Sequence, residues 1–330
     1  MEGSLAWGVL GTGTVARLAM LPALSRIPSA HVLAVGSASR ERAELCAAQH
    51  HIPRAYGTYQ DVLDDPDIHA VYVALPNALH REWVIRAARA GKHVLCEKPL
   101  GCAAGEVEEM ARACDSASVL LMEALMYHFH PRTERLRDLL AGGIIGEVRH
   151  VSAAFTFSLE DWSNYRAHPD AGGGALLDVG GYCVSAVRSI LGAEPVAISA
   201  VAHVGDTGID DTTAALLEFT AGRTADIVCS FRAAEHQRIT IIGTAGVLEV
   251  PLAFTAWQSD AAPLHIHRAG TAQTLSGDPA DPYALMAECF TEAVRNGTPA
   301  PYPLAETLAT ARVIDAIARA ATTHHTRPTS

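Results

Sequence analysis

The chain has 330 residues, of which 49% are hydrophobic and 18% charged, so it can bury the cores of two domains and is not expected to be disordered. Its formal net charge of −11, without a basic cluster, argues against nucleic acid or an anionic membrane as the main partner. No apolar run approaches the ~18 residues of a membrane span, and the N-terminus enters a strand too soon for a signal peptide.

The first predicted element is a buried strand, Leu5 to Leu10, followed by a turn and a helix over Val15 to Leu24. The turn reads Gly-Thr-Gly-Thr-Val-Ala, the dinucleotide-binding pattern in the strand–turn–helix context that it requires. Its first glycine allows the tight turn, its second lets a pyrophosphate approach the backbone, and its alanine allows close helix packing. We predict that a dinucleotide contacts Gly11, Thr12, Gly13, Thr14, Val15 and Ala16.

The second strand, His31 to Val35, ends where NAD-binding proteins usually carry an acid for the ribose 2′-hydroxyl. Here the chain reads Gly-Ser-Ala-Ser-Arg, and the first acid, Glu41, falls inside the next predicted helix. Two serines and an arginine suit a 2′-phosphate, which predicts NADP rather than NAD, bound by Ser37, Ser39 and Arg40. Alternatively Ser39 caps the helix and Arg40 is solvated, and both interpretations can hold together.

Strands and helices keep alternating, which predicts a parallel, doubly wound Rossmann domain over residues 1–122. Strands are expected at 55–56, 70–74, 94–96 and 119–122, and helices at 42–50, 59–63, 80–90 and 103–115. Residues at or just beyond the carboxyl ends of parallel strands should line one crevice. The cofactor contacts expected there are Leu75, Pro76, Asn77, His80, Glu97 and Lys98.

Lys98 stands in the stretch His-Val-Leu-Cys-Glu-Lys-Pro-Leu, where a short apolar strand runs into a charged pair and a proline. Pro99 ends the strand because it has no N–H for a sheet ladder. Lys98 is thereby placed at the edge of the sheet where ligands bind. There it can polarise a substrate oxygen or lower the pKa of a neighbouring acid, or it can simply be a solvated lysine in an ion pair.

From residue 123 the pattern changes to period-two alternation, which predicts an α+β domain over 123–330 with a large, mostly antiparallel open sheet. A helix is expected to about residue 140, and others end at Leu191 or cover 283–295 and 305–321, the last packing back on the first domain. Strands are expected at 149–157, 196–204, 212–219, 225–231, 238–242 and 247–250, and the tail from 322 looks frayed.

The chemically dense part of this second half reads Gly-Gly-Gly-Ala-Leu-Leu-Asp-Val-Gly-Gly-Tyr, from 172 to 182. Asp178 and Tyr182 are four residues apart on the predicted helix and share one face. They could simply hydrogen-bond and pack, but three glycines that permit close backbone approach favour a face turned to a ligand. Arg166 and Tyr127 are further candidates for substrate contact.

Neither the histidines nor the cysteines predict a metal or disulfide site. His128 and His130 alternate, as do His265 and His267, but the sequence nominates no third ligand, so we predict no metal. The seven cysteines stand singly, without a CxxC pair, which indicates reduced thiols in a cytoplasmic protein. Cys96 and Cys183, near the predicted site, are expected to be buried structural thiols.

With the GTGTVA turn, the LPNALH segment and CEKPL in place, the chain resembles the Gfo/Idh/MocA oxidoreductase family over roughly residues 5 to 320. Its GGGxLxDxGxY segment resembles the branch with glucose–fructose oxidoreductase, dimeric dihydrodiol dehydrogenase and NADP-dependent xylose dehydrogenases. The resemblance implies an NAD(P)-dependent dehydrogenase of sugars and related compounds. It also implies a candidate cis peptide at Lys98–Pro99 and a homodimer or larger homo-oligomer through the open sheet.

The resemblance also implies roles for the site residues. Tyr182 would be the general acid/base, and Lys98 would lower its pKa from the ordinary value of about 10 and bind the reacting oxygen. Asp178 would orient the substrate or the lysine, with Tyr127 and Arg166 touching the substrate. One departure is His128, where relatives often have arginine.

The expected reaction is hydride transfer between NADP(H) and a sugar or related carbonyl or alcohol, as in an aldose dehydrogenase or a keto-sugar reductase. Three alternatives stay open: a non-catalytic NADP-binding regulator, a sugar-nucleotide 3-ketoreductase, and an NAD-dependent glycoside hydrolase. Regulators of this family tend to lack the lysine that Lys98 matches, and the apparent 2′-phosphate site argues against the hydrolase.

Overall fold

The computed structural model describes residues 4–256, 261–277 and 279–323. The chain divides into two compact units: unit 1 comprises Met1–Met126 and Asp281–Leu308, and unit 2 comprises Tyr127–Ala280 and Ala309–Ser330. The chain thus passes into unit 2 four residues after the predicted position and returns to unit 1 for one segment. The N-terminal residues 1–3 and most of the expected frayed tail, 324–330, lie outside the described residues.

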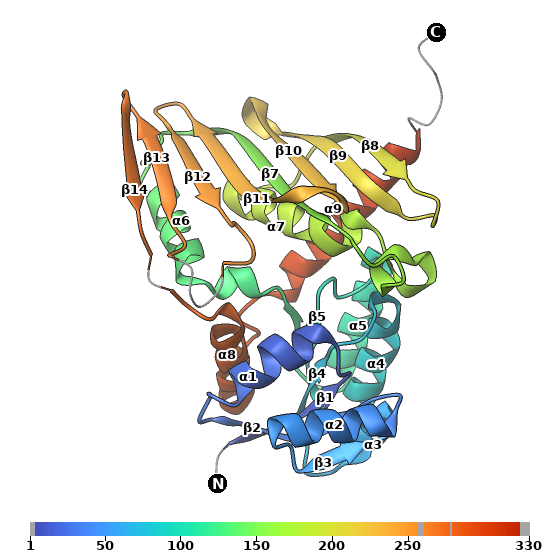
Figure 1. The fold of residues 1–330 in the computed structure, drawn as a ribbon. Coiled ribbons are helices and arrows are strands. Elements are labelled where there is room, and N and C mark those ends of the chain that lie inside the picture. The colour runs from blue at the N-terminus through green and yellow to red at the C-terminus, as the bar shows by residue number, and fades with distance from the viewer. Residues whose placement is uncertain (1–3, 257–260, 278, 324–330) are drawn as a thin grey trace. The chain divides into compact units, whose positions relative to one another are not determined.

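Unit 1 contains a six-stranded parallel sheet in the order β3-β2-β1-β4-β5-β6, which confirms the predicted doubly wound Rossmann fold (Figure 1). The central strand β1 is buried along its whole length, so its apolar run forms the middle of the core. The strands are β1 (Leu5–Leu10), β2 (Ala30–Gly36), β3 (Arg54–Tyr56), β4 (Ala70–Val73), β5 (His93–Glu97) and β6 (Leu121–Ala124). The helices are α1 (Leu21–Leu24), α2 (Arg40–His50), α3 (Tyr59–Asp64), α4 (Asn77–Arg89), α5 (Ala104–Ser116) and α8 (Pro282–Asn296).

The late helix α8 belongs to unit 1 because it packs on the first strand. The ring of Trp7 in β1 lies 5.4 Å from the ring of Phe290 in α8, and both side chains are fully buried. This contact between distant parts of the sequence explains why residues 281–308 return to unit 1.

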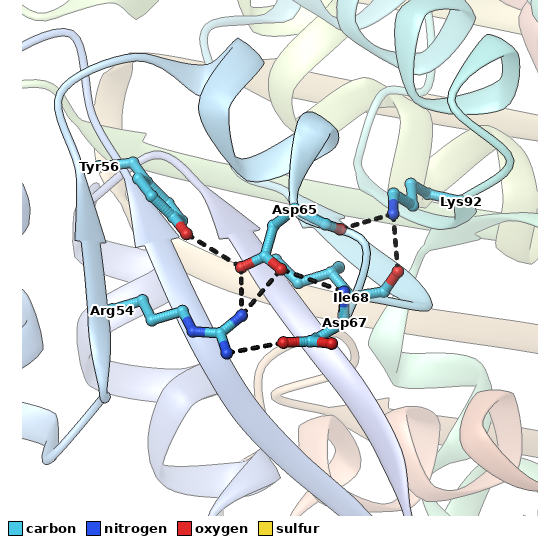
Figure 2. Close-up of polar contacts among 6 residues, drawn as sticks. All are labelled: Arg54, Tyr56, Asp65, Asp67, Ile68 and Lys92. Atoms are coloured by element: carbon cyan, nitrogen blue, oxygen red, sulfur yellow. Dashed lines mark hydrogen bonds and ion pairs between the residues drawn. The ribbon is translucent and has the colours of Figure 1, made fainter.

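A cluster of polar side chains lies at the amino ends of β4 and β5 (Figure 2). Arg54 donates two hydrogen bonds to the buried carboxylate of Asp65, at 2.6 and 2.8 Å, and Tyr56 donates a third at 3.0 Å. The buried ammonium of Lys92 donates to the carbonyls of Asp65 and Ile68, both at 2.8 Å. Since this edge is opposite the carboxyl ends, the cluster holds the sheet together away from the predicted crevice.

Unit 2 contains an eight-stranded sheet in the order β14-β13-β12-β11-β7-β10-β9-β8, antiparallel except for the parallel pair β7 and β10. Figure 1 shows α6 and α7 beneath one face of this sheet. The strands are β7 (Val148–Ser158), β8 (Ala197–Val204), β9 (Asp210–Phe219), β10 (Arg223–Ser230), β11 (Arg232–Gly243), β12 (Val247–Pro251), β13 (Leu264–Arg268) and β14 (Thr271–Leu275). The helices are α6 (Pro131–Ala141), α7 (Gly181–Leu191) and α9 (Leu304–Thr323), whose first residues belong to unit 1.

The sequence missed the last two strands and half of β11. Residues 271–274 of β14 are exposed and 275 is half-buried, so the hydrophobic alternation that marks a half-buried strand is absent there. The first five residues of β11 are likewise exposed. These segments are strands because they pair with a neighbour, which single-sequence patterns do not record.

Two predicted α-helices begin with a π-helical turn, at Ala16–Met20 before α1 and at Leu176–Gly180 before α7. A π-helical turn carries i to i+5 hydrogen bonds and occurs often at functional sites. The α-helical spacing assumed for Asp178 and Tyr182 is therefore wrong, because Asp178 lies in the π turn and Tyr182 in α7.

The expectation that no stretch is long and apolar enough for a membrane span needs correction. By length and composition alone, the helical stretch Pro169–Leu191 passes that test, but 78% of its most apolar window is buried inside the fold. Such burial is typical of a core helix packed against a sheet, and α7 indeed packs on β7 and β10.

Candidate active site

The Gly11–Ala16 turn has the form that a dinucleotide site needs. Gly11 has φ +106°, and a Cβ there would lie 2.3 Å from the carbonyl oxygen of Ala74, so only glycine fits. Gly13 is exposed and Ala16 is fully buried, which leaves the backbone open to a ligand while the helix packs closely. The cradle fits the pyrophosphate predicted for Thr12, Thr14 and their neighbours.

At the end of β2, the structure gives the two serines different environments. Ser37 is buried, and Ser39 caps α2 by accepting a hydrogen bond from the amide of Arg42 at 3.3 Å. Arg40 is exposed and pairs with Glu44 at 2.9 Å. The cap predicted as the alternative role of Ser39 is therefore present, and binding of a 2′-phosphate by this group stays a prediction.

His80 in α4 connects two loops of the predicted crevice. Its ring nitrogens lie 2.9 Å from the carbonyl oxygen of Leu75 and 2.8 Å from that of Pro99, and the side chain is fully buried. Burial lowers its pKa, and the nearby charge of Lys98 acts in the same direction. Any contribution of His80 to cofactor binding is thus indirect, through the segment with Leu75, Pro76 and Asn77 that it holds in place.

Glu97 and Lys98 end β5, and buried acids surround the lysine. Glu97 is buried and accepts a 2.5 Å hydrogen bond from the hydroxyl of Tyr72. Burial, and next the charge of Glu97, raises the pKa of Tyr72. Glu123 in β6 is also buried, which raises its pKa, while the amide of Leu100 and the charge of Lys98 oppose that rise. The Lys98 backbone is therefore fixed from two sides, and the Lys98–Pro99 peptide is cis.

In unit 2, the glycine cluster lets two loops approach each other. A Cβ on Gly173 would lie 2.3 Å from the carbonyl oxygen of Arg166, and one on Gly174 would lie 2.3 Å from a carboxylate oxygen of Asp210. Asp210 also accepts a hydrogen bond from the amide of Leu176 at 2.8 Å. The described glycine contacts are thus made with the protein itself, and they position the helical turn that carries Asp178.

Arg166 and Asp178 form a partly buried ion pair. The Nε of Arg166 donates to the Asp178 carboxylate at 2.8 Å, and the side chain of Asp178 is 4% exposed. Burial would lower the pKa of Arg166, but Asp178, with Tyr165 and Tyr182 nearby, raises it. The structure therefore places Arg166 and Asp178 in contact, with Tyr182 near enough to affect the pKa of Arg166, and the common role of the three residues in one site stays a prediction.

The ring of Tyr182 lies in an aromatic cluster. Its centroid is 5.5 Å from those of Phe155 and Phe254 and 6.0 Å from that of Tyr127. The hydroxyl of Tyr127 donates to Ser185 at 3.0 Å. Tyr127 thus packs beside Tyr182, and its predicted contact with substrate stays a prediction.

His128, named above as a departure from the family pattern, is a half-buried side chain that connects Arg137 to Ser185. Its Nδ1 accepts from Arg137 at 3.1 Å, so its Nε2 carries the proton and donates to Ser185 at 2.8 Å. Burial, together with the charges of Arg137 and Arg188, lowers the pKa of His128 to about 3. The ring is therefore neutral at physiological pH.

Two of the histidines weighed as metal ligands, His130 and His265, have partners within the protein, and five of the seven cysteines are buried. His130 accepts from the amide of Arg132 at the start of α6, and His265 contacts Thr274 at 3.0 Å. Within the described ranges, no three potential ligands gather as a metal site. All seven cysteines are free thiols, and Cys96 and Cys183 are buried as predicted.

The sequence analysis missed several residues that hold the candidate site in place, and it did not use the small number of lysines in the chain. Tyr72, Glu123 and Asp210 hold the site, and an acid inside an apolar strand, as at Glu123, would have indicated a special role. The chain contains only two lysines, and every other cationic side chain apart from histidine is arginine. Lys92 is structural, which leaves Lys98 as the lysine whose predicted catalytic role stays a prediction.

Comparison with known proteins shows which family this chain matches. Residues 5–125 match the model of an oxidoreductase family with an NAD-binding Rossmann fold, and residues 133–249 match the GFO/IDH/MocA C-terminal domain. The chain is 39% identical over 319 residues to D-xylose 1-dehydrogenase (NADP(+)) 2 from Haloferax volcanii, covering 96% of this chain and 97% of that protein. It is 38% identical over 250 residues to trans-1,2-dihydrobenzene-1,2-diol dehydrogenase from Mus musculus, covering 75% and 74%.

The fold is also similar to that of a 3-ketoreductase from Actinomadura kijaniata, solved in complex with NADP and TDP-benzene. The TM-score is 0.93 at 33% identity, and the match covers 96% of this chain and 98% of that one. Family models and relatives thus agree over nearly the whole sequence. This chain belongs to the Gfo/Idh/MocA family of oxidoreductases.

Proposed function

We propose that this protein is an NADP(H)-dependent oxidoreductase that transfers hydride between the nicotinamide and a sugar or a related carbonyl or alcohol. The observation that carries the proposal is Lys98, whose backbone is fixed at the carboxyl end of β5 by buried Glu97 and by Glu123, which binds the Leu100 amide. Ligands bind at this edge in doubly wound sheets, and the Gly11 cradle opens on the same edge.

In this proposal the residues move a proton while the bound cofactor supplies or accepts the hydride at its nicotinamide. Tyr182 donates the proton to the substrate oxygen in reduction and removes it in oxidation. The Lys98 ammonium stabilises the phenolate and the reacting oxygen. Asp178, held by Arg166, orients the substrate, and Tyr127 and Arg166 shape its binding site.

The cofactor preference is proposed from the end of β2. No acid faces the ribose position before Glu41, whereas Ser37, Ser39 and Arg40 offer hydroxyls and a guanidinium for a 2′-phosphate. The similar xylose dehydrogenase has NADP(+) in its name, and the similar ketoreductase was solved with NADP bound. Both observations support the same preference.

Two substrate classes fit best. The Haloferax relative favours a free aldose, and the similar ketoreductase, which carries a TDP ligand, favours a nucleotide-linked keto sugar. The test is nicotinamide absorbance with free aldoses, TDP-linked keto sugars and dihydrodiols, with NADP(H) and NAD(H) in parallel. Turnover that prefers the phosphorylated cofactor supports the proposal. Tight NADP(H) binding without turnover across both classes would replace it with a regulatory role.

We also propose a cytoplasmic homodimer that forms through the sheet of unit 2. The face of that sheet opposite α7 exposes Val201, Leu216 and Ile242, at 60%, 47% and 41% of their full exposure. Ser152 and Asp226 lie on the same face, so it is mixed in polarity, and exposed apolar side chains on such a face can form part of an interface between protein subunits. Free thiols throughout the chain fit a reducing compartment.

A further inference from the structure

Unit 2 contains a cavity of about 590 Å³ whose lining includes Tyr127 but neither Tyr182 nor Asp178. One face of α6, the second half of α7 and the sheet enclose it. Its apolar wall comes from both helices and from three strands. The apolar lining residues are Leu136, Leu140, Ile190, Val148, Ile239 and Val250. This volume is that of an ordinary small-molecule site.

Cationic side chains surround the apolar wall. Arg132, Arg137, Arg149 and Arg223 line the cavity, and Glu147 is its one acidic lining residue. The whole chain carries a net charge of −11, so this concentration of positive charge runs against its overall balance. Guanidinium groups beside an apolar wall are complementary to an anion with an apolar body.

The four arginines are not equivalent. Arg132 is buried and donates to the carbonyls of Pro251 and Leu252 at 2.8 and 2.7 Å, so its role is structural. Arg149 pairs with Glu147 at 2.6 Å, but both side chains are about half exposed or more, and such surface pairs are easily exchanged.

Arg137 and Arg223 both line the cavity, one from α6 and one from the start of β10. Arg137 donates one hydrogen bond to His128, and Arg223 donates to the carbonyl of Leu191 at 2.8 Å and to the carbonyl and hydroxyl of Thr220 at 3.2 and 3.5 Å. A guanidinium carries five N–H donors, so each of these groups can also bind an anion while it keeps its present bonds.

We infer that this cavity binds a small amphipathic anion, a carboxylate or phosphate ester joined to an apolar chain or ring, at a site separate from Lys98 and Tyr182. The apolar body lies against Leu136, Leu140 and Ile239, and Arg137 and Arg223 hold the anionic group. The inference concerns binding alone and does not depend on the proposed reaction.

The test is calorimetric titration of the full-length protein, saturated with NADP+ so that the phosphate sites of the cofactor are filled. The probes are hexyl phosphate, hexanoate, hexan-1-ol and inorganic phosphate. We expect one site for a hexyl anion, with hexan-1-ol and inorganic phosphate at least about tenfold weaker, because each lacks half of the recognised chemistry. The stronger of hexyl phosphate and hexanoate identifies the anionic group.

Variants of the lining residues test whether the measured binding takes place in this cavity. Arg137→Gln with Arg223→Gln should weaken hexyl anion binding by about tenfold or more, whereas Arg135→Gln, an exposed arginine on the same helix outside the cavity lining, should not change it. Leu140→Trp should fill the cavity and abolish binding, with the unfolding temperature as the check on folding. No binding of either hexyl anion, equal binding of inorganic phosphate, or binding unaffected by the arginine and Leu140 variants would overturn the inference.

Discussion

At the scale of single residues, the clearest consequence concerns His128, a half-buried neutral histidine between Arg137 and Ser185. Its pKa is about 3 in the folded protein and about 6.5 in the unfolded chain. Between these values the unfolded chain binds the extra proton. Stability must therefore fall as the pH drops from about 6.5 towards 3, by up to about 1.4 kcal/mol per pH unit from this residue.

We predict that His128→Gln reduces the loss of stability between pH 6.5 and pH 4. The other histidines titrate equally in both proteins, so the difference between the two curves of unfolding temperature against pH isolates residue 128. The native chain should have the higher unfolding temperature at pH 7, and this difference should shrink and then change sign as the pH falls. Parallel curves from pH 7 to pH 4 would show that the pKa of His128 is not lowered in the folded protein.

At the scale of elements, the cluster at Asp65 fixes β3, β4 and β5 at their beginning. Asp65→Asn leaves the guanidinium of Arg54 without its bidentate, buried partner, so we expect a loss of about 2–3 kcal/mol in the free energy of unfolding. Asp67→Asn is the matched control, because Asp67 contacts the same arginine but is 62% exposed, and should change stability by less than about 1 kcal/mol. Urea unfolding measures both, and similar values would contradict the structural role of burial here.

A second element-scale prediction concerns the turn that carries Asp178. Gly174 has φ +120° and no room for a Cβ beside Asp210, so Gly174→Ala should displace the turn and reduce hydride transfer by about tenfold or more. Gly105→Ala in α5 is the control, since its Cβ meets open space and alanine favours a helix. Full activity of Gly174→Ala would show that the position of Asp178 does not depend on this approach.

At the scale of the whole molecule, the exposed leucine and valine side chains on the face of the unit 2 sheet opposite α7 predict the oligomeric state. Leu216→Glu introduces a charge on β9, next to the edge strand β8, and should convert the proposed dimer to monomers in light scattering. Leu45→Glu, a comparably exposed leucine on α2, should leave the dimer unchanged. Dimers that persist in Leu216→Glu would place the interface elsewhere.

Sequence patterns predicted the Rossmann half well because each element there is marked by burial or by a cap. The run Leu5–Leu10 is entirely buried, and the glycine that follows it is required by its backbone angle. The edge strand β14 was missed because its side chains face solvent, so only pairing with β13 defines it.

The sequence predicted which residues of the candidate site lie at strand ends. It did not predict the residues that hold them in place. Glu97 is 26 residues from Glu123, and Asp210 is 36 residues from Gly174 along the chain, so nothing local connects these partners. The π turn at Leu176–Gly180 also changed the spacing that sequence periodicity assumes for Asp178. Long-range packing determines these features, and a single sequence does not display it.

The most direct test of the account is hydride transfer by Lys98→Met, measured together with NADPH binding. The account predicts that kcat/KM falls by about a hundredfold or more, that the NADPH dissociation constant changes little, and that Lys98→Arg restores only part of the rate, since an arginine supplies charge but not a compact ammonium. A Lys98→Met variant with the turnover of the native chain would contradict the assignment of Lys98, and with it the proposed chemistry.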